Sequence, residues 1–130
     1  MTRTDAFADA LATDAGAGTG DSGVYARIVH DIRDSAMTVQ ELADITGTNR
    51  RQVTNWANGA SKPGPSTRDR LLEVHYLVGM LRDVYTREGA EIWLHGRKRS
   101  LDGQRPIDLL RAGDFATVLQ AVERLRTGAM

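Results

Sequence analysis

The chain has 130 residues, which is enough for one ordinary domain or two small modules that share a core, and too few for a large multidomain enzyme. Seventeen basic and seventeen acidic side chains give a formal net charge of zero, so attraction to nucleic acid or lipid has to come from local charge. The absence of cysteine excludes disulfides, thiolate metal sites and cysteine nucleophiles. No apolar run approaches the roughly 20 residues of a membrane span and no signal-peptide pattern is present, so we expect a cytoplasmic protein with no membrane partner.

Residues 1–23 form an acidic head that contains one arginine, four aspartates and only two large apolar side chains, Phe7 and Leu11. So little apolar surface does not offset the entropy lost on ordering, which predicts a disordered tail. The alternative is a short amphipathic turn that docks on a partner, since Phe7 and Leu11 are four residues apart.

After the tail, each periodic apolar segment has helical spacing and none alternates as a strand does, which predicts an all-α fold. Thr38 and Glu41 form an S/T-x-x-E capping box at the start of a short helix. Gly47 ends this helix, and Thr48 or Asn49 can cap the next one. Two short helices joined by a tight turn are typical of a helix-turn-helix.

Residues 24–65 therefore resemble the Xre or Cro/repressor type of helix-turn-helix, and the resemblance rests on Leu42-Ala43, Gly47, Val53, Trp56, Gly59 and Pro63. In such a fold Val53 and Trp56 are scaffold residues that face the core. The opposite side of the same helix is the candidate DNA-reading face, with Asn49, Arg50, Arg51, Gln52 and Asn55.

Side chains of these types suit base edges, because Arg forms two hydrogen bonds with guanine and Asn or Gln forms two with adenine. Lys62 and Arg68 flank the following loop and suit phosphates. The alternative is that this polar face is merely solvated. Because the chain is neutral, one copy is expected to bind DNA weakly, so useful affinity requires two or more copies on one operator.

A long helix is predicted next, with Ser66 and Asp69 as its cap-like pair and an end near Tyr85. It carries two adjoining apolar seams, the first with Leu71, Val74, Val78, Leu81 and Tyr85 and the second with Leu72, Tyr76, Leu77, Met80 and Val84. Such a helix is covered on two sides, by the helix-turn-helix and by either the C-terminal module or a second subunit. The alternative is that both seams belong to one internal core.

Three shorter helices follow. The first covers 87–94 with Ile92, Trp93 and Leu94 as its apolar cluster, and Gly96 ends it. Pro106 opens the second at its favoured first position, and Gly113 stops it. Asp114 can cap the last helix.

Residues 66–130 resemble the C-terminal toxin-binding domain of the Xre/MbcA/ParS antitoxins. The resemblance rests on the order and spacing of Trp93-Leu94, Leu101, Gly103, Pro106, Leu109-Leu110, Gly113, Val118-Leu119, Leu125 and Gly128. It implies an antitoxin of a type II toxin–antitoxin system that covers the NAD-binding cleft of a RES-type, NAD-consuming toxin and represses its own operon. The implied partners are the cognate toxin, operator DNA and a second copy of the chain, in a homodimer or a larger toxin–antitoxin hetero-oligomer.

Within this half we expect Trp93, Pro106 and Leu110 to be scaffold. The candidate toxin contacts are the basic loop and the chain's last residues, namely Arg97, Lys98, Arg99, Arg126, Thr127, Gly128, Ala129 and Met130. The alternative is a solvated loop and a frayed terminus.

The sequence favours a binding protein over an enzyme. His30, His75 and His95 are the only histidines, they lie in separate predicted elements, and none belongs to a metal-site or nucleophile motif. We therefore expect no metal and no cofactor. The alternative to an antitoxin is a free-standing Xre-family transcriptional regulator whose C-terminal half only dimerises or senses a ligand.

Overall fold

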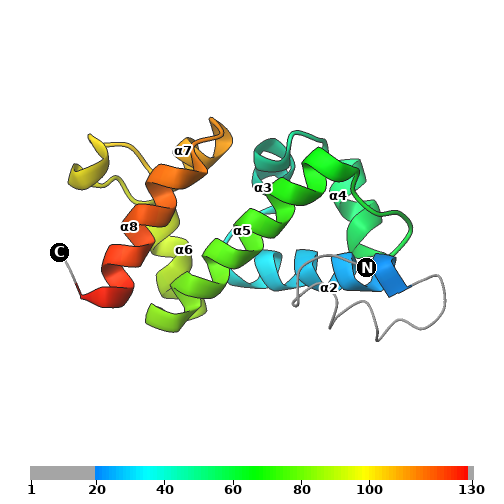
Figure 1. The fold of residues 1–130 in the computed structure, drawn as a ribbon, viewed down its shortest axis with the longest axis horizontal. Helices are drawn as coiled ribbons and strands as arrows, with labels where there is room; N and C mark the ends of the chain where they lie inside the picture. Colours follow the sequence, from blue (N-terminus) through cyan, green and yellow to red (C-terminus); the bar gives the residue numbers. More distant parts are fainter. Residues whose placement is uncertain (1–19, 129–130) are drawn as a thin grey trace.

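The computed structural model describes residues 20–128, and within this range the chain folds into helices joined by short loops (Figure 1). The all-α prediction is confirmed. The elements are α2 (Gly20–Ser35), α3 (Val39–Thr46), α4 (Arg50–Ala57), α5 (Pro65–Val84), α6 (Arg87–His95), the short 3-10 helix η1 (Arg99–Leu101), α7 (Pro106–Arg111) and α8 (Phe115–Thr127). None of the helices between residues 20 and 128 is long and apolar enough to cross a membrane.

The predicted tail lies mostly outside the described residues, including Phe7 and Leu11. Helix α2 begins at Gly20, so the prediction that the tail continues to residue 23 is wrong for 20–23. The physical reason is that Val24 and Tyr25 pack against the core and stabilise the turn that precedes them.

Helix α5 passes through the middle of the molecule, and the other helices are arranged around it (Figure 1). It contacts α2 and α3 from the N-terminal half and α6 and α8 from the C-terminal half. Helix α4 packs on α2 and α3, whereas α7 packs on α3, α6 and α8. The two halves therefore meet along α5, where α2 lies against α6, and where α3 lies against α7.

The local signals for α3 and α4 act as predicted. Thr38 Oγ1 accepts from the Glu41 amide at 3.1 Å, and the Thr38 amide donates to Glu41 Oε1 at 2.9 Å, so the capping box is complete. Gly47 ends α3 with a φ of 79°, in the left-handed region that glycine adopts without strain. Asn49, rather than Thr48, caps α4 by accepting from the Gln52 amide at 2.9 Å.

The start of α5 differs from the prediction. Ser66 and Asp69 do not cap it; Gly64 is the N-cap residue without a side-chain bond, and Pro65 occupies the first helical position. Proline suits this position because its φ is already helical and its missing N–H would have no partner there. The helix therefore begins two residues earlier than the cap-like pair suggested.

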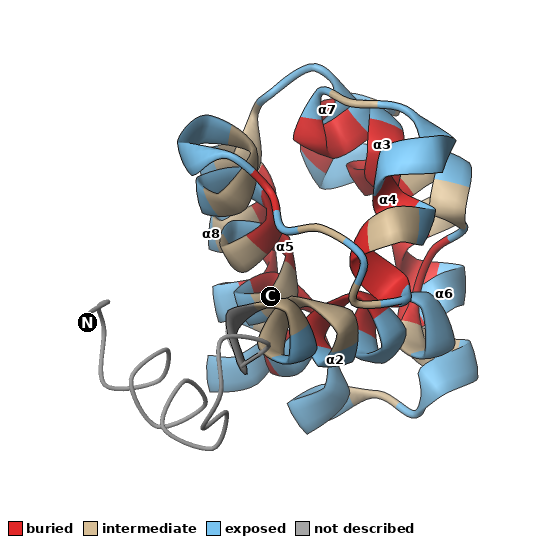
Figure 2. Ribbon diagram, turned by 90° about the vertical axis from the view of Figure 1, so that its right-hand side faces the viewer, coloured by how far each residue is buried: buried red, intermediate tan, exposed pale blue. Residues whose placement is uncertain are grey.

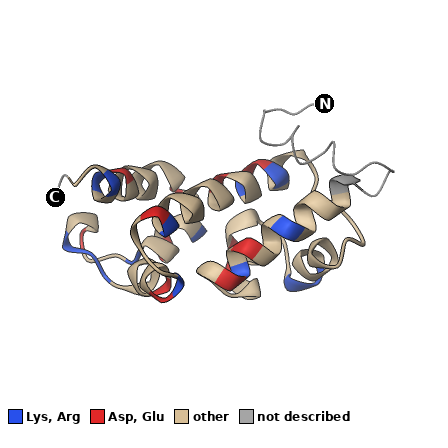
Figure 3. Cartoon of the chain, turned by 90° about the horizontal axis from the view of Figure 1, so that it is seen from below, with Lys and Arg blue, Asp and Glu red and all other residues tan. Residues whose placement is uncertain are grey.

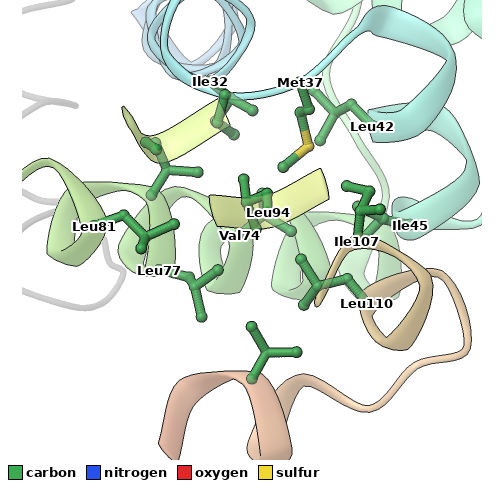
Figure 4. Packing of buried hydrophobic residues seen from close by; sticks show 14 of the residues in the cluster. Ile32, Met37, Leu42, Ile45, Val74, Leu77, Leu81, Leu94, Ile107 and Leu110 are labelled. Carbon is green, nitrogen blue, oxygen red and sulfur yellow. The ribbon is translucent and has the colours of Figure 1, made fainter. Parts of the chain in front are cut away.

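One cluster of buried apolar side chains extends through both halves, and the buried parts of the helices face inward (Figure 2). In Figure 4, Leu94 of α6 lies beside Val74 of α5, and Ile45 of α3 lies close to Ile107 and Leu110 of α7. Whether the boundary predicted between residues 65 and 66 separates two functional modules stays a prediction, but the described residues share one core.

The second apolar seam of α5 is only partly covered by the described residues. The first seam is buried from Leu71 to Leu81, whereas Tyr76 in the second seam is 57% exposed and Val84 is 40% exposed. Ile92, which we expected in the apolar cluster of α6, is 72% exposed. The expectation for Ile92 is wrong because α6 buries its opposite side, with Ala90, Trp93 and Leu94.

Candidate functional surfaces

Helix α4 is held by its apolar side, and this fixes the direction of its polar side. Val53 and Trp56 are buried against the N-terminal helices, as expected for scaffold residues. At the end of α4, the ring Nε2 of His30 in α2 lies 3.2 Å from the Ala57 carbonyl oxygen. Helices α2 and α3 both contact α4. The arrangement is a braced short helix that presents one polar face outward.

The structure places the predicted DNA-reading residues together on this outward face. Asn49, Arg50, Arg51 and Gln52 are exposed, and Asn55 is half-buried. The Asn49 side-chain oxygen caps α4, so base recognition by this residue would use its amide nitrogen. The first turn of α4 thus offers several hydrogen-bond donors in one place.

The two predicted phosphate contacts lie on other elements. Lys62 is exposed in the loop after α4, and Arg68 is half-buried in the first turn of α5, where its Nε lies 3.9 Å from Asp69 Oδ1. Lys and Arg side chains occur on both halves of the molecule (Figure 3). The basic groups near α4 are therefore a local patch and not part of a single basic side of the molecule.

The predicted basic loop has a defined shape. Lys98 and Gln104 form an isolated antiparallel bridge, and Arg97 Nη1 donates to the Gly103 carbonyl oxygen at 3.1 Å. Lys98 Nζ lies 5.1 Å from the centroid of the Trp93 ring, and partial burial lowers the pKa of Lys98. Arg97 and Arg99 are exposed, whereas Lys98 is half-buried and lies against the Trp93 ring.

The predicted contacts at the end of the chain lie on α8 and just beyond it. Arg126 Nε is 3.7 Å from Asp83 Oδ2 of α5, the Thr127 hydroxyl donates to the Arg124 carbonyl oxygen, and Gly128 ends α8 with a φ of 78°. Ala129 and Met130 lie outside the described residues. Figure 1 places the basic loop and the end of α8 on the same side of the molecule, the left of the view.

The remaining scaffold residues are buried. Trp93 is 9% exposed and Leu110 is 2% exposed, and Pro106 is buried at the start of α7. Asp114 caps α8 as predicted, accepting from the Thr117 amide at 3.1 Å. These residues position the loop and α8 relative to α5.

Sequence reasoning missed a polar contact that joins the two halves. His95 of α6 lies with Nε2 2.8 Å from Glu41 Oε2 of α3, and its Nδ1 lies 2.7 Å from the Glu91 carbonyl oxygen. Each nitrogen of the His95 ring thus has an oxygen within hydrogen-bond distance, one from α3 and one from its own helix. The residues are 54 positions apart, and no local signal in the sequence indicates the pairing.

A second polar contact joins α3 to α7. Arg111 Nε lies 3.3 Å from Asp44 Oδ2 and its Nη1 lies 3.6 Å from Asp108 Oδ1. Arg105 donates two hydrogen bonds to Asp108, at 2.8 and 2.9 Å, which hold the pKa of Asp108 below its usual range. This small ionic cluster covers the edge of the contact between the two helices.

Within residues 20–128, no group of three or more His, Asp or Glu side chains has an arrangement that could hold a metal ion. His30, His75 and His95 each have a polar neighbour from a distant segment: the Ala57 carbonyl, Asp31 and Glu41. Each histidine thus joins two segments that are distant in the sequence.

Comparison with known proteins agrees with this architecture. Residues 80–128 match the family described as "Antitoxin Xre/MbcA/ParS C-terminal toxin-binding domain". The matched segment runs from the last five residues of α5 to the end of α8 and includes the basic loop. The fold together with this match defines the chain as an antitoxin.

Similarity to antitoxins extends beyond that segment. The chain is 36% identical over 102 residues to "Probable mycobacterial cidal antitoxin Rv3188" of Mycobacterium tuberculosis, an alignment that covers 78% of this chain and 87% of the relative. It is 30% identical over 92 residues to the mycobacterial cidal antitoxin MbcA of Mycobacterium bovis, which covers 71% of this chain and 81% of the relative. A chain in the crystal structure of the M. tuberculosis MbcT–MbcA toxin–antitoxin complex matches with a TM-score of 0.70 and 29% identity, over 82% of this chain and 97% of that chain. The chain belongs to the Xre/MbcA/ParS antitoxin family, which confirms the predicted resemblance.

Proposed function

We propose that this antitoxin neutralises a RES-type, NAD-consuming toxin by covering the toxin's NAD-binding cleft with its C-terminal half. The observation that carries the proposal is the match to the MbcT–MbcA complex, which covers most of the chain and involves an antitoxin assembled with a toxin. The same C-terminal half carries the family match. We place this activity in the cytoplasm and assign the chain no catalytic role.

The exposed groups at this end suit such a contact. Blocking a cleft requires shape complementarity and a few polar contacts rather than chemistry. Arg97 and Arg99 project from a loop that is held in place by the Lys98–Gln104 bridge. A loop with a fixed shape loses less entropy on binding than a loose one. Arg126 to Met130 remain the second group of candidate contacts.

We further propose that the outward face of α4 reads the operator of the chain's own operon. The face presents Asn49, Arg50, Arg51 and Gln52 on a helix braced by α2 and α3. With few phosphate contacts in each copy, the electrostatic part of the affinity is small, so at least two copies are needed on one operator. Repression then belongs to a homodimer or to a toxin–antitoxin hetero-oligomer.

The deciding experiment for neutralisation is growth of cells that express the neighbouring gene's product, with and without this chain, together with their NAD level. Rescue of both growth and NAD is the expected result. If the neighbouring product is harmless, or stays toxic while this folded chain is present, the proposal is wrong. Co-purification distinguishes the antitoxin from the alternative function. A homodimer that purifies without a toxin and shifts a specific operator would identify a free-standing regulator.

A further inference from the structure

Thr54 lies on the outward side of α4 and was not among the predicted reading residues. The buried side of this helix is formed by Val53, Trp56 and Ala57. Because successive residues are about 100° apart around a helix axis, Arg51 lies opposite that side, and Thr54 lies between Arg50 and Arg51, one turn further along. Thr54 is exposed, whereas the predicted Asn55 is half-buried. The outward face of α4 therefore includes Thr54.

Nothing in the fold explains a threonine at this position. Its side chain is not part of the core, and within the described part of the chain its hydroxyl forms no hydrogen bond. The hydroxyl of Thr46, by contrast, donates to the Leu42 carbonyl oxygen at 2.7 Å. Threonine is also a weaker helix former than alanine, because its branched side chain loses rotamer freedom in a helix. The methyl and the hydroxyl of Thr54 are thus both available to a partner.

The methyl group of Thr54 differs chemically from the rest of the reading face. The other exposed side chains in the first turn of α4 end in amide or guanidinium groups, which form hydrogen bonds with base edges and phosphates. The major groove of DNA presents one apolar group, the C5-methyl of thymine, and a threonine methyl is among the groups that contact it. The methyl of Thr54 therefore matches thymine, as the arginines match guanine.

The spacing along α4 indicates where such a thymine would lie. Thr54 follows Arg50 by four residues and Arg51 by three. Side chains at these spacings are neighbours on the helix surface, with Cβ atoms about 5–6 Å apart. Base pairs are stacked about 3.4 Å apart, so this separation corresponds to about one to two base-pair steps. The expected feature of the operator is a thymine within two steps of a guanine.

We propose that Thr54 recognises the C5-methyl group of a thymine in the operator, next to a guanine contacted by Arg50 or Arg51. This inference rests on the proposed function, in which the outward face of α4 reads DNA. It adds an apolar contact to a face that otherwise uses hydrogen bonds and charge. Uracil in place of that thymine keeps every hydrogen-bonding group of the base and removes only the methyl, so the exchange isolates the contact.

The test measures mobility shifts of the full chain on duplexes from the region upstream of its own gene. In these duplexes one thymine at a time is replaced by uracil. The wild-type chain is expected to bind about threefold to fivefold more weakly when the contacted thymine of a half-site is replaced, because burying one methyl-sized group contributes about that much. Replacement of the other thymines is expected to leave the affinity unchanged.

Two variants separate the methyl of Thr54 from its hydroxyl. Thr54→Ser removes the methyl, so it is expected to bind the thymine duplex about threefold to fivefold more weakly and to bind the uracil duplex equally well. Thr54→Val keeps a methyl and removes the hydroxyl, so it is expected to retain both the affinity and the preference for thymine. The position is exposed, so thermal unfolding of both variants should stay close to that of the wild type.

Lys62→Gln is the matched control for weaker binding. Loss of a phosphate contact lowers the affinity for the thymine and uracil duplexes equally, so the preference for thymine should be unchanged. A thymine preference that disappears in Lys62→Gln as well as in Thr54→Ser would mean that the preference does not depend on the Thr54 methyl, and the inference would be wrong.

The remaining outcomes distinguish this inference from the proposed function. Specific binding without a uracil effect at any thymine, or an effect that persists in Thr54→Ser, would overturn the methyl contact and leave α4 as the reading face. Equal weakening by Thr54→Val and Thr54→Ser would assign the contact to the hydroxyl and would also overturn it. If the wild-type chain binds none of the upstream duplexes specifically, the proposed repression is wrong, and so is the contact at Thr54.

Discussion

The contact between His95 and Glu41 gives the sharpest test of how the two halves are joined. Glu41 has two roles at once, since Oε1 accepts from the Thr38 amide in the capping box and Oε2 accepts from His95 of α6. Glu41→Gln keeps an oxygen for the capping box, which tolerates glutamine, and removes the charge that faces His95. The substitution therefore isolates the contact between α3 and α6 from the capping of α3.

The expected magnitude follows from the geometry. A hydrogen bond to a charged group contributes about 1.5–3 kcal/mol and a neutral one about 0.5–1.5 kcal/mol. The Glu41 side chain is 13% exposed and the His95 side chain 26% exposed, so solvent screens part of the charge. Because glutamine still exchanges a neutral bond with the ring, we expect a coupling of about 1 kcal/mol between Glu41→Gln and His95→Ala.

The assay is urea unfolding of the wild type, both single variants and the double variant. The coupling is the difference between the effect of the double variant and the sum of the single ones. Gln40→Ala combined with His95→Ala is the control, because Gln40 is exposed on the same helix and bonds to Asp44 instead. If the effects of Glu41→Gln and His95→Ala on the free energy of unfolding add to within about 0.5 kcal/mol, the two side chains are not coupled and the expected contact is refuted.

Three further predictions follow from the proposed contacts and the packing. Arg51→Ala is expected to weaken operator binding in a mobility-shift assay by about tenfold or more and to leave growth rescue intact, and loss of rescue by this folded variant would contradict separate surfaces for DNA and toxin. Leu94→Ala, at a fully buried position, is expected to lower the free energy of unfolding by about 2–5 kcal/mol, whereas Ile92→Ala on the exposed side of the same helix changes it by less than about 0.5 kcal/mol. Because Arg105 lowers the pKa of Asp108, the stabilising effect of the pair is present above the ordinary aspartate pKa and is lost as the pH falls through the lowered one. Arg105→Gln is therefore expected to destabilise the chain near neutral pH and to match the wild type in strong acid, and a stability difference that persists unchanged in acid would count against the pairing.

Local signals made much of the fold predictable. The capping box at Thr38, the glycine at position 47 and the cap at Asp114 each act within one helical turn, so the residues that decide the structure are neighbours in sequence. The start of α5 was predicted wrongly because two local signals compete there. The proline at position 65 sets the first helical residue, and the hydroxyl of Ser66 does not cap the helix.

Contacts between distant segments could not be predicted from the sequence. The contact of Glu41 with His95 and the ion pair of Asp44 with Arg111 depend on how helices pack, not on spacing along the chain. The exposure of Ile92 has the same origin, because a helix with apolar residues on several sides does not reveal which side its neighbours cover. Of the candidate sites, the composition of the α4 face was predictable, whereas the fixed shape of the basic loop was not.

The packing of α3 on α7 bears on how long the protein survives in the cell. Helices that share one core unfold together, so a ligand held at one end protects the other end by mass action. If the C-terminal half holds a toxin as proposed, the complex shields the α4 face from proteases that degrade unfolded chains. The lifetime of the repressor would then depend on the supply of toxin. Because antitoxin and repressor are the same chain, a shortage of toxin would lead to the loss of both activities together.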